Sequence, residues 1–119
     1  MSSIAKVLLE MGYSVSGSDI TPSQRLEYLK RLGALVSVGH NPKNIIGADV
    51  AITSAAVPRS NVEIIAACQH EIPILTRAEV LGELVNAGFG IAVTGTHGKT
   101  TTSSMIGLMT IEAGLDPTI

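Results

Sequence analysis

The chain has 119 residues, enough for one modest domain, and 45% of them are hydrophobic, so we expect a buried core. Only 3% are aromatic, which favours an aliphatic core of the kind found in parallel sheets covered by helices. The net charge of −2 gives no basic field for nucleic acid, and a single cysteine excludes an internal disulfide. No run of residues resembles a membrane span or a signal peptide, so we expect a cytoplasmic protein without membrane insertion.

Helical and extended segments alternate along the first 88 residues. Ile4, Val7, Leu8 and Met11 follow helical spacing and predict a helix over residues 3–11, while short apolar runs predict strands. The predicted strands cover residues 13–17, 34–38, 50–53 and 72–75, and the further helical segments cover 21–32, 41–46, 62–70 and 76–85.

Three polar clusters predict where helices begin. Residues 21–24 read as a capping box with Pro22 at the first helical position, Asn61 can cap the next long helix, and residues 76–79 form a second capping box. The helix that Asn61 opens carries Cys68 on what reads as a buried face, so we expect no catalytic role for this thiol.

The alternation of strands and helices predicts a Rossmann-like parallel sheet with helices on both faces. Residues 86–90 form a glycine-bearing connector, which suggests a first domain over residues 1–88 and the start of a second over 89–119. The chain opens inside a helix, and its apolar tail carries few charges after residue 84. We therefore expect a fragment: most of one α/β domain, then the first strand–loop–helix unit of another.

The most informative stretch is the glycine-containing loop at residues 95–102. An apolar run over 91–94 predicts a strand before it, and residues 103–113 read as a helix after it, which is the layout of a phosphate-binding loop. Lys99 would reach the β- and γ-phosphates of ATP, and the Thr100 hydroxyl would hold Mg²⁺. The residues predicted to bind the nucleotide are Gly95, Thr96, His97, Gly98, Lys99, Thr100 and Thr101.

The spacing of this loop departs from the usual pattern G-x-x-x-x-G-K-S/T, because Val93 stands where the first glycine is expected. The alternative interpretation is a plain glycine turn with an exposed lysine. The strand–loop–helix context favours the phosphate-binding interpretation.

Residues 92–102 resemble the ATP loop of the Mur ligases, the amide-forming enzymes of peptidoglycan assembly, which lack the first P-loop glycine. His97, before Gly98 and Lys99, indicates the branch that acts on muramate and alanine. Further segments resemble the same branch, so the resemblance covers essentially the whole chain: residues 16–19, 54–58, 77–79 and 113–118.

The resemblance implies a parent enzyme that uses ATP and Mg²⁺ to join L-alanine to UDP-N-acetylmuramate through an acyl phosphate. It implies catalytic roles for Lys99 and Thr100, with Thr100 as a metal ligand. It places the family's acidic Mg²⁺ ligand beyond Ile119, so we expect the 119 residues alone to be inactive. A related branch, which joins a ready-made peptide to the same sugar nucleotide, is the alternative, because the amine pocket lies outside this chain.

The first domain is expected to bind the UDP-sugar at the ends of its strands. Ser18 and Asp19 follow the second predicted element, and an acid there reads a ribose hydroxyl in dinucleotide-binding folds, whereas the resemblance implies contact with the uridine end. The other candidates are His40, Ser54, Ala55 and Arg77, of which Arg77 suits a diphosphate. A turn role for Asp19 and a non-ligand role for His40 stay open.

Rivals from other classes remain. A nucleotide-binding fragment without catalytic activity fits the same loop. A nicotinamide-dependent dehydrogenase is disfavoured because no G-x-G-x-x-G is present, and a GTPase because no guanine-reading motif follows the loop. The histidines and Cys68 lack the spacing of zinc ligands.

Overall fold

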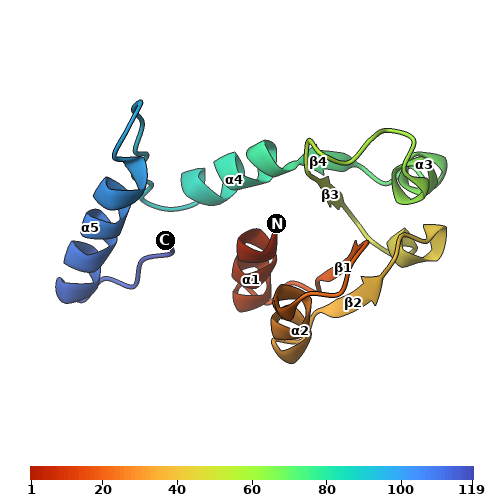
Figure 1. The fold of residues 1–119 in the computed structure, drawn as a ribbon, viewed down its shortest axis with the longest axis horizontal. Coiled ribbons are helices and arrows are strands. Elements are labelled where there is room, and N and C mark those ends of the chain that lie inside the picture. The colour runs from red at the N-terminus through yellow and green to blue at the C-terminus, as the bar shows by residue number, and fades with distance from the viewer. The chain divides into compact units, whose positions relative to one another are not determined.

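The computed structural model describes residues 1–119, which form two compact units, Met1–Leu84 and Val85–Ile119 (Figure 1). The elements in chain order are α1 (Ser2–Glu10), β1 (Ser16–Asp19), α2 (Gln24–Arg31), β2 (Leu35–Val38), the short 3₁₀ helix η1 (Pro42–Ile45), β3 (Ala51–Thr53), α3 (Val62–Gln69), β4 (Ile74–Thr76), α4 (Arg77–Asn86) and α5 (Lys99–Glu112).

The first unit is built from two strand–helix–strand crossovers. β1 pairs in parallel with β2, in the register Ser16 to Leu35, and α2 connects them. β3 pairs in parallel with β4, in the register Ala51 to Ile74, and α3 connects them. The parallel α/β character predicted from the sequence is confirmed.

The single continuous sheet predicted from the sequence is not formed. The four strands make two separate two-stranded sheets, and no ladder joins one pair to the other. Alternation along a chain predicts strands and crossovers, but it does not encode which strands lie side by side across a sheet.

The start of α2 differs from the prediction. Ser23, not Thr21, caps the helix: its backbone is extended, and its hydroxyl accepts the Leu26 N–H at 3.3 Å. Pro22 therefore precedes the cap instead of occupying the first helical position. Serine and threonine offer the same capping oxygen, so a sequence with both at neighbouring positions leaves the choice to the chain path.

The other two helix starts follow the prediction. The Asn61 side chain caps α3 by accepting the Glu63 N–H at 2.9 Å. Thr76 and Glu79 form a reciprocal capping box, in which the Thr76 N–H donates to Glu79 Oε2 at 2.7 Å and the Glu79 N–H donates to Thr76 Oγ1 at 3.3 Å. This box lets α4 begin directly where β4 ends.

β1 begins later than predicted, at Ser16 instead of Tyr13. The Tyr13 N–H donates to the Leu8 carbonyl at 3.0 Å and so still closes the end of α1. Just before the ladder between β1 and β2 begins, the Leu35 N–H donates to the Val15 carbonyl at 3.0 Å. Residues 13–15 therefore connect α1 to β1 and are not part of the strand.

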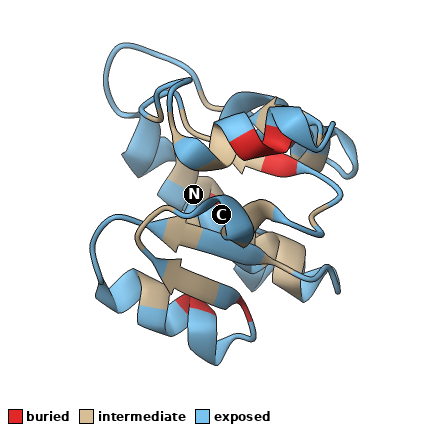
Figure 2. Ribbon diagram, turned by 90° about the vertical axis from the view of Figure 1, so that its right-hand side faces the viewer, coloured by how far each residue is buried: buried red, intermediate tan, exposed pale blue.

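Few residues of the chain are buried (Figure 2), and most of the buried side chains are short. The buried hydrophobic residues are Ile4, Leu29, Ala34, Ala51, Ala66, Ala67 and Val80. Cys68 is exposed, which corrects its expected burial. Successive residues of a helix point about 100° apart, so the turn that buries Ala66 and Ala67 directs the next side chain outward.

The second unit consists of α5 and the irregular residues that precede it. The strand predicted over residues 91–94 is absent, because no neighbouring strand supplies the ladder of hydrogen bonds that a strand requires. α5 begins at Lys99, four residues earlier than the predicted Ser103. Within this unit, Gly107 is buried against the side chain of Ile119. No helix of the chain is both long and apolar enough to cross a membrane.

Candidate functional site

The loop before α5 is shaped by glycines in conformations that other residues avoid. Gly95 has a φ of +148° and Gly98 a φ of +77°, in the left-handed region. Gly98 also occupies the N-cap position of α5, where it offers no side-chain acceptor to the helix. The glycines thus turn the chain into the helix and leave its first amides uncapped.

The amides at the start of α5 are available to an anion. The first backbone hydrogen bond at this end runs from the Thr102 N–H to the Gly98 carbonyl at 2.9 Å, so the N–H groups of residues 99–101 precede it. No side chain caps them. Uncapped amides and the positive end of the helix dipole together attract phosphate.

The Lys99 ammonium is held over the same loop. Its Nζ donates to the Gly95 carbonyl at 2.6 Å and lies 3.4 Å from the Thr96 carbonyl. These contacts fold the side chain back toward the loop from the first residue of α5. A fixed positive charge and several free N–H groups therefore converge on residues 95–101, all of which are exposed.

A second polar site lies in the first unit, where β1 and β2 end. The Ser18 hydroxyl lies 3.0 Å from His40 Nδ1, and it donates to Glu63 Oε2 at 2.6 Å. His40 Nδ1 is also 3.3 Å from Glu63 Oε2. The structure therefore brings together two of the predicted substrate-binding residues, Ser18 and His40, around a carboxylate that the sequence analysis did not select.

Glu63 is the centre of this cluster. Its Oε1 accepts the Asn44 side-chain amide at 2.7 Å and the Asn41 backbone N–H at 3.2 Å. Desolvation raises the pKa of Glu63, but the hydrogen bonds from Ser18, Asn44 and Asn41, with the nearby His40, outweigh it and bring the pKa below the ordinary value. The carboxylate is therefore ionised near neutral pH and accepts hydrogen bonds at both oxygens.

Sequence reasoning missed Glu63 because its partners are distant along the chain. The Ser18–Glu63 contact joins residues 45 apart, and the Asn41 and Asn44 contacts join residues 22 and 19 apart. No local motif encodes such a contact. An acid in the first turn of a capped helix, as in Asn61-Val62-Glu63, has an ordinary electrostatic explanation.

The remaining predicted substrate residues follow strand ends without joining this hydrogen-bonded cluster. Asp19 is the last residue of β1, and its backbone carbonyl accepts the Gly39 N–H at 2.7 Å. Ser54 and Ala55 lie in the turn after β3, where the Ser54 carbonyl accepts the Val57 N–H at 3.1 Å. Arg77 is the exposed first residue of α4, directly after β4.

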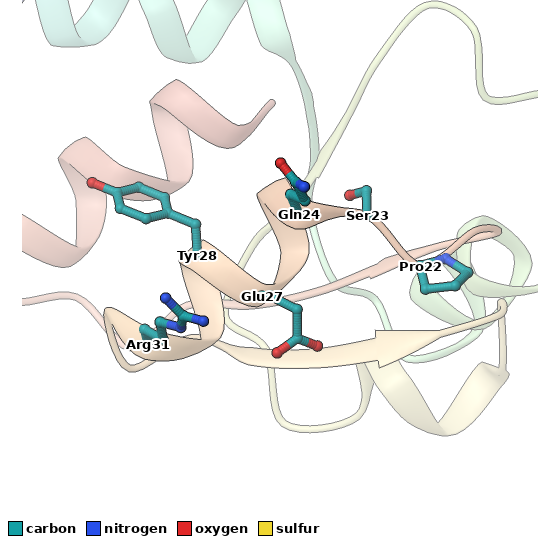
Figure 3. Close-up of a pocket in the computed structure, with 6 residues that line it drawn as sticks. All are labelled: Pro22, Ser23, Gln24, Glu27, Tyr28 and Arg31. Carbon is teal, nitrogen blue, oxygen red and sulfur yellow. The ribbon is translucent and has the colours of Figure 1, made fainter.

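A surface depression of about 600 Å³ lies elsewhere, along α2 and the turn before it (Figure 3). Its lining residues are Pro22, Ser23, Gln24, Glu27, Tyr28 and Arg31. All six are exposed, and none is a predicted site residue. Ligand sites are concave, enclose most of their ligand and lie at strand ends in α/β folds, so we assign no function to this open surface.

No three side chains among the histidines, the cysteine and the acids lie together as metal ligands. A Mg²⁺ ion at the loop would instead rely on a hydroxyl and on phosphate oxygens, which is how this ion is bound in many nucleotide sites.

Comparison with known proteins places the chain in a family. Residues 1–88 match the model described as "Mur ligase family, catalytic domain". A UDP-N-acetylmuramate–L-alanine ligase from Endomicrobium trichonymphae is 49% identical over 119 residues, and one from Thiobacillus denitrificans is 52% identical over 118 residues. The chain spans 26% of the length of each of these two relatives. The loop at 95–101 lies outside the family match but inside both of these alignments.

Two solved structures share the fold. A UDP-N-acetylmuramate-alanine ligase from Thermotoga maritima gives a TM-score of 0.84 at 34% identity, over 92% of this chain and 26% of that one. A UDP-N-acetylmuramate:L-alanyl-gamma-D-glutamyl-meso-diaminopimelate ligase from Neisseria meningitides gives 0.85 at 29% identity, over 96% of this chain and 36% of that one. Together with the match over residues 1–88, these similarities establish that the chain belongs to the Mur ligase family.

Proposed function

We propose that the chain is the N-terminal portion of an ATP-dependent ligase that joins L-alanine to UDP-N-acetylmuramate in peptidoglycan biosynthesis. The observation that carries this proposal is the 49% identity over all 119 residues with a relative of that name. Because the chain spans 26% of that relative, the activity belongs to the longer enzyme.

Residues 89–119 would bind ATP through the loop before α5. The free N–H groups of residues 99–101 and the Lys99 ammonium supply the positive groups that phosphate oxygens need. In the ligase, ATP would supply the phosphoryl group that activates a carboxylate toward an amine. Lys99 would hold its charge at the phosphates while negative charge builds on their oxygens.

Thr100 would provide a hydroxyl to Mg²⁺. It is the second residue of α5 and exposed, and its side chain makes no hydrogen bond within the chain, so the hydroxyl is available to a metal. Mg²⁺ usually keeps several waters and takes only one or two protein ligands besides phosphate, so a single hydroxyl suits the ion.

Residues 1–88 would bind the sugar nucleotide at the strand ends. Ser18, His40 and Glu63 form one hydrogen-bonded cluster at the carboxyl ends of β1 and β2, and Asp19 is the next residue after Ser18. Ser54 and Ala55, in the turn after β3, and Arg77, at the start of α4, would complete the site. Polar groups at the carboxyl ends of parallel strands are where ligands bind in open α/β folds.

The peptide ligase is the second candidate. The structure from Neisseria meningitides is as similar to this chain in fold as the alanine ligase is, with TM-scores of 0.85 and 0.84. The two proteins differ, by their names, in the amine partner joined to UDP-N-acetylmuramate.

The test is Lys99→Ala in the full-length enzyme that contains this chain. We expect turnover with ATP, UDP-N-acetylmuramate and L-alanine to fall at least about 100-fold, because a positioned charge on the phosphates is lost. Binding of UDP-N-acetylmuramate, measured by calorimetry, should stay within about two-fold. Lys30→Ala, an exposed lysine on α2, is the matched control and should leave both unchanged.

If Lys99→Ala retained turnover within a factor of two of the wild type, the proposal that Lys99 binds the phosphates of ATP would be wrong. Phosphate release and mass detection of the amide, run with alanine and with a murein peptide, separate the two candidates. Release with the peptide alone would make the peptide ligase the correct activity.

A further inference from the structure

The hydrogen bonds around Glu63 leave one consistent arrangement of protons. The ionised carboxylate only accepts, and its Oε1 already faces two donors, the Asn41 N–H and the Asn44 amide. Its Oε2 accepts the single hydroxyl proton of Ser18 at 2.6 Å. The Ser18 oxygen therefore has no proton left for His40, and it can only accept from it.

His40 Nδ1 must then carry the proton. It faces two acceptors, the Ser18 oxygen at 3.0 Å and Glu63 Oε2 at 3.3 Å. In the reverse arrangement, Ser18 would donate its proton to His40 Nδ1. The Ser18 oxygen and Glu63 Oε2 would then lie 2.6 Å apart with no proton between them, and the lone pair of His40 Nδ1 would face the carboxylate. Both contacts would be repulsive, so the alternative tautomer is disfavoured.

We propose that Glu63 is a positioning residue that acts both directly and through Ser18 to hold the neutral form of His40 as the Nδ1–H tautomer, so that Nε2 is a hydrogen-bond acceptor. His40 Nε2 has no hydrogen-bond partner in the chain, and the His40 side chain is 23% exposed. The ring comes directly after β2 and Gly39, at a strand end.

The tautomer determines which ligand group the site accepts. Only an N–H or O–H donor can bond to a bare imidazole nitrogen, whereas a carbonyl or phosphate oxygen would be repelled. The imide N–H of uracil and the ribose hydroxyls are donors of this kind. This step rests on the proposed function, because it takes the ligand to be a UDP-sugar. The tautomer itself does not depend on that ligand.

Glu63→Gln should reverse the tautomer. The two donors at Oε1 select the oxygen of the new side-chain amide, since the Asn41 N–H belongs to the backbone and cannot turn. The NH₂ group then faces Ser18 and donates to its oxygen. The Ser18 proton is released to donate to His40 Nδ1, and the imidazole proton moves to Nε2.

Ser18→Ala should keep the wild-type tautomer, because His40 Nδ1 can donate directly to Glu63 Oε2, 3.3 Å away. A purely structural role for the cluster would not make these two variants differ in this way. Glu83→Gln, an exposed acid of α4, is the matched control and should also keep the Nδ1–H form.

The measurement is a long-range ¹H–¹⁵N correlation spectrum of the full-length enzyme that contains this chain, with ¹⁵N-labelled imidazoles, at about pH 8, where an ordinary imidazole is neutral. His40→Gln identifies the His40 signals by subtraction from those of the other histidines. Unchanged dispersion of the α3 amide signals shows that each variant is folded. An Nε2–H form in the wild type, or in Ser18→Ala, would overturn the proposal, as would an Nδ1–H form in folded Glu63→Gln.

A second measurement tests the ligand. Calorimetry on the full-length enzyme should show about ten-fold weaker binding of UDP-N-acetylmuramate by Glu63→Gln, with Glu83→Gln unchanged. Equal affinity despite a reversed tautomer would overturn the role of Nε2 in binding. No binding by the wild type would instead contradict the proposed function, and the spectra would still decide the tautomer.

Discussion

Glu63 makes hydrogen bonds through both its side chain and its backbone. Its side chain accepts hydrogen bonds from a strand end, from η1 and from the turn between β2 and η1, while its own backbone N–H is capped by Asn61. Because its pKa is lowered on folding, the folded chain binds this proton less tightly than the unfolded chain does.

This shift predicts how stability depends on pH. The carboxylate contributes stability above its ordinary pKa of 4.5, and the contribution is lost as the pH falls through the lower folded value. The difference in free energy of unfolding between the wild type and Glu63→Gln should therefore be largest at about pH 7 and shrink below about pH 4.5. Urea denaturation across this range measures it.

Glu83→Gln serves as the control for that series, because Glu83 is exposed and makes no side-chain hydrogen bond. The free energy of unfolding of Glu83→Gln should stay close to that of the wild type at every pH. A Glu63→Gln difference that grows toward acid would contradict the assigned direction of the shift.

The residue-level site was partly predictable from the sequence. Ser18, Asp19 and His40 follow predicted strand segments, so position alone selects them. Lys99 and its glycines form a local motif, in which spacing carries the information. Glu63 could not be found in this way, because its role arises from contacts across 19 to 45 residues that only the fold creates.

At the level of elements, every predicted helical segment is present, whereas one predicted strand is absent. Helix starts depend on one or two neighbouring side chains, as at Asn61 and Thr76, so they can be predicted from a short stretch of sequence. Strands depend on partners. The apolar residues 91–94 remain irregular without a ladder, although their composition suits a strand.

The cap of α2 gives a direct test of one such local choice. Ser23→Ala should lower the free energy of unfolding by about 1 kcal/mol, because the Leu26 N–H loses its acceptor. Thr21→Ala should change it by less than about 0.5 kcal/mol, since the Thr21 hydroxyl makes no hydrogen bond. Thermal and urea unfolding of the two variants measure the difference. A larger loss of stability in Thr21→Ala than in Ser23→Ala would instead support Thr21 as the cap, as predicted from the sequence.

At the level of the whole chain, the small side chains of the core limit the stability. Four of the seven buried hydrophobic residues are alanines, and no large side chain is fully buried. Large apolar side chains are exposed instead, including Phe89 at 97% and Leu35 at 76%. Apolar burial is the main source of folding free energy, so little of it is available here.

Calorimetry should reflect this poor core. A well-packed chain of this length would unfold near 60 °C with an enthalpy of about 80 kcal/mol. We expect the 119 residues alone to give a clearly smaller enthalpy and a broader transition. The chain should also bind a dye for exposed apolar surface while folded. A single sharp transition with the full enthalpy would contradict this expectation.

The long reach of the Glu63 contacts has a consequence for folding rates. Each strand–helix–strand unit can form from contacts close in sequence, whereas the bond from Ser18 to Glu63 closes a loop of 45 residues. Such a contact is expected to form after the main barrier has been crossed. Weakening it should then speed unfolding and leave the folding rate nearly unchanged. The lifetime of the folded first unit, and with it its resistance to proteases, would depend on a carboxylate that takes no part in starting the fold.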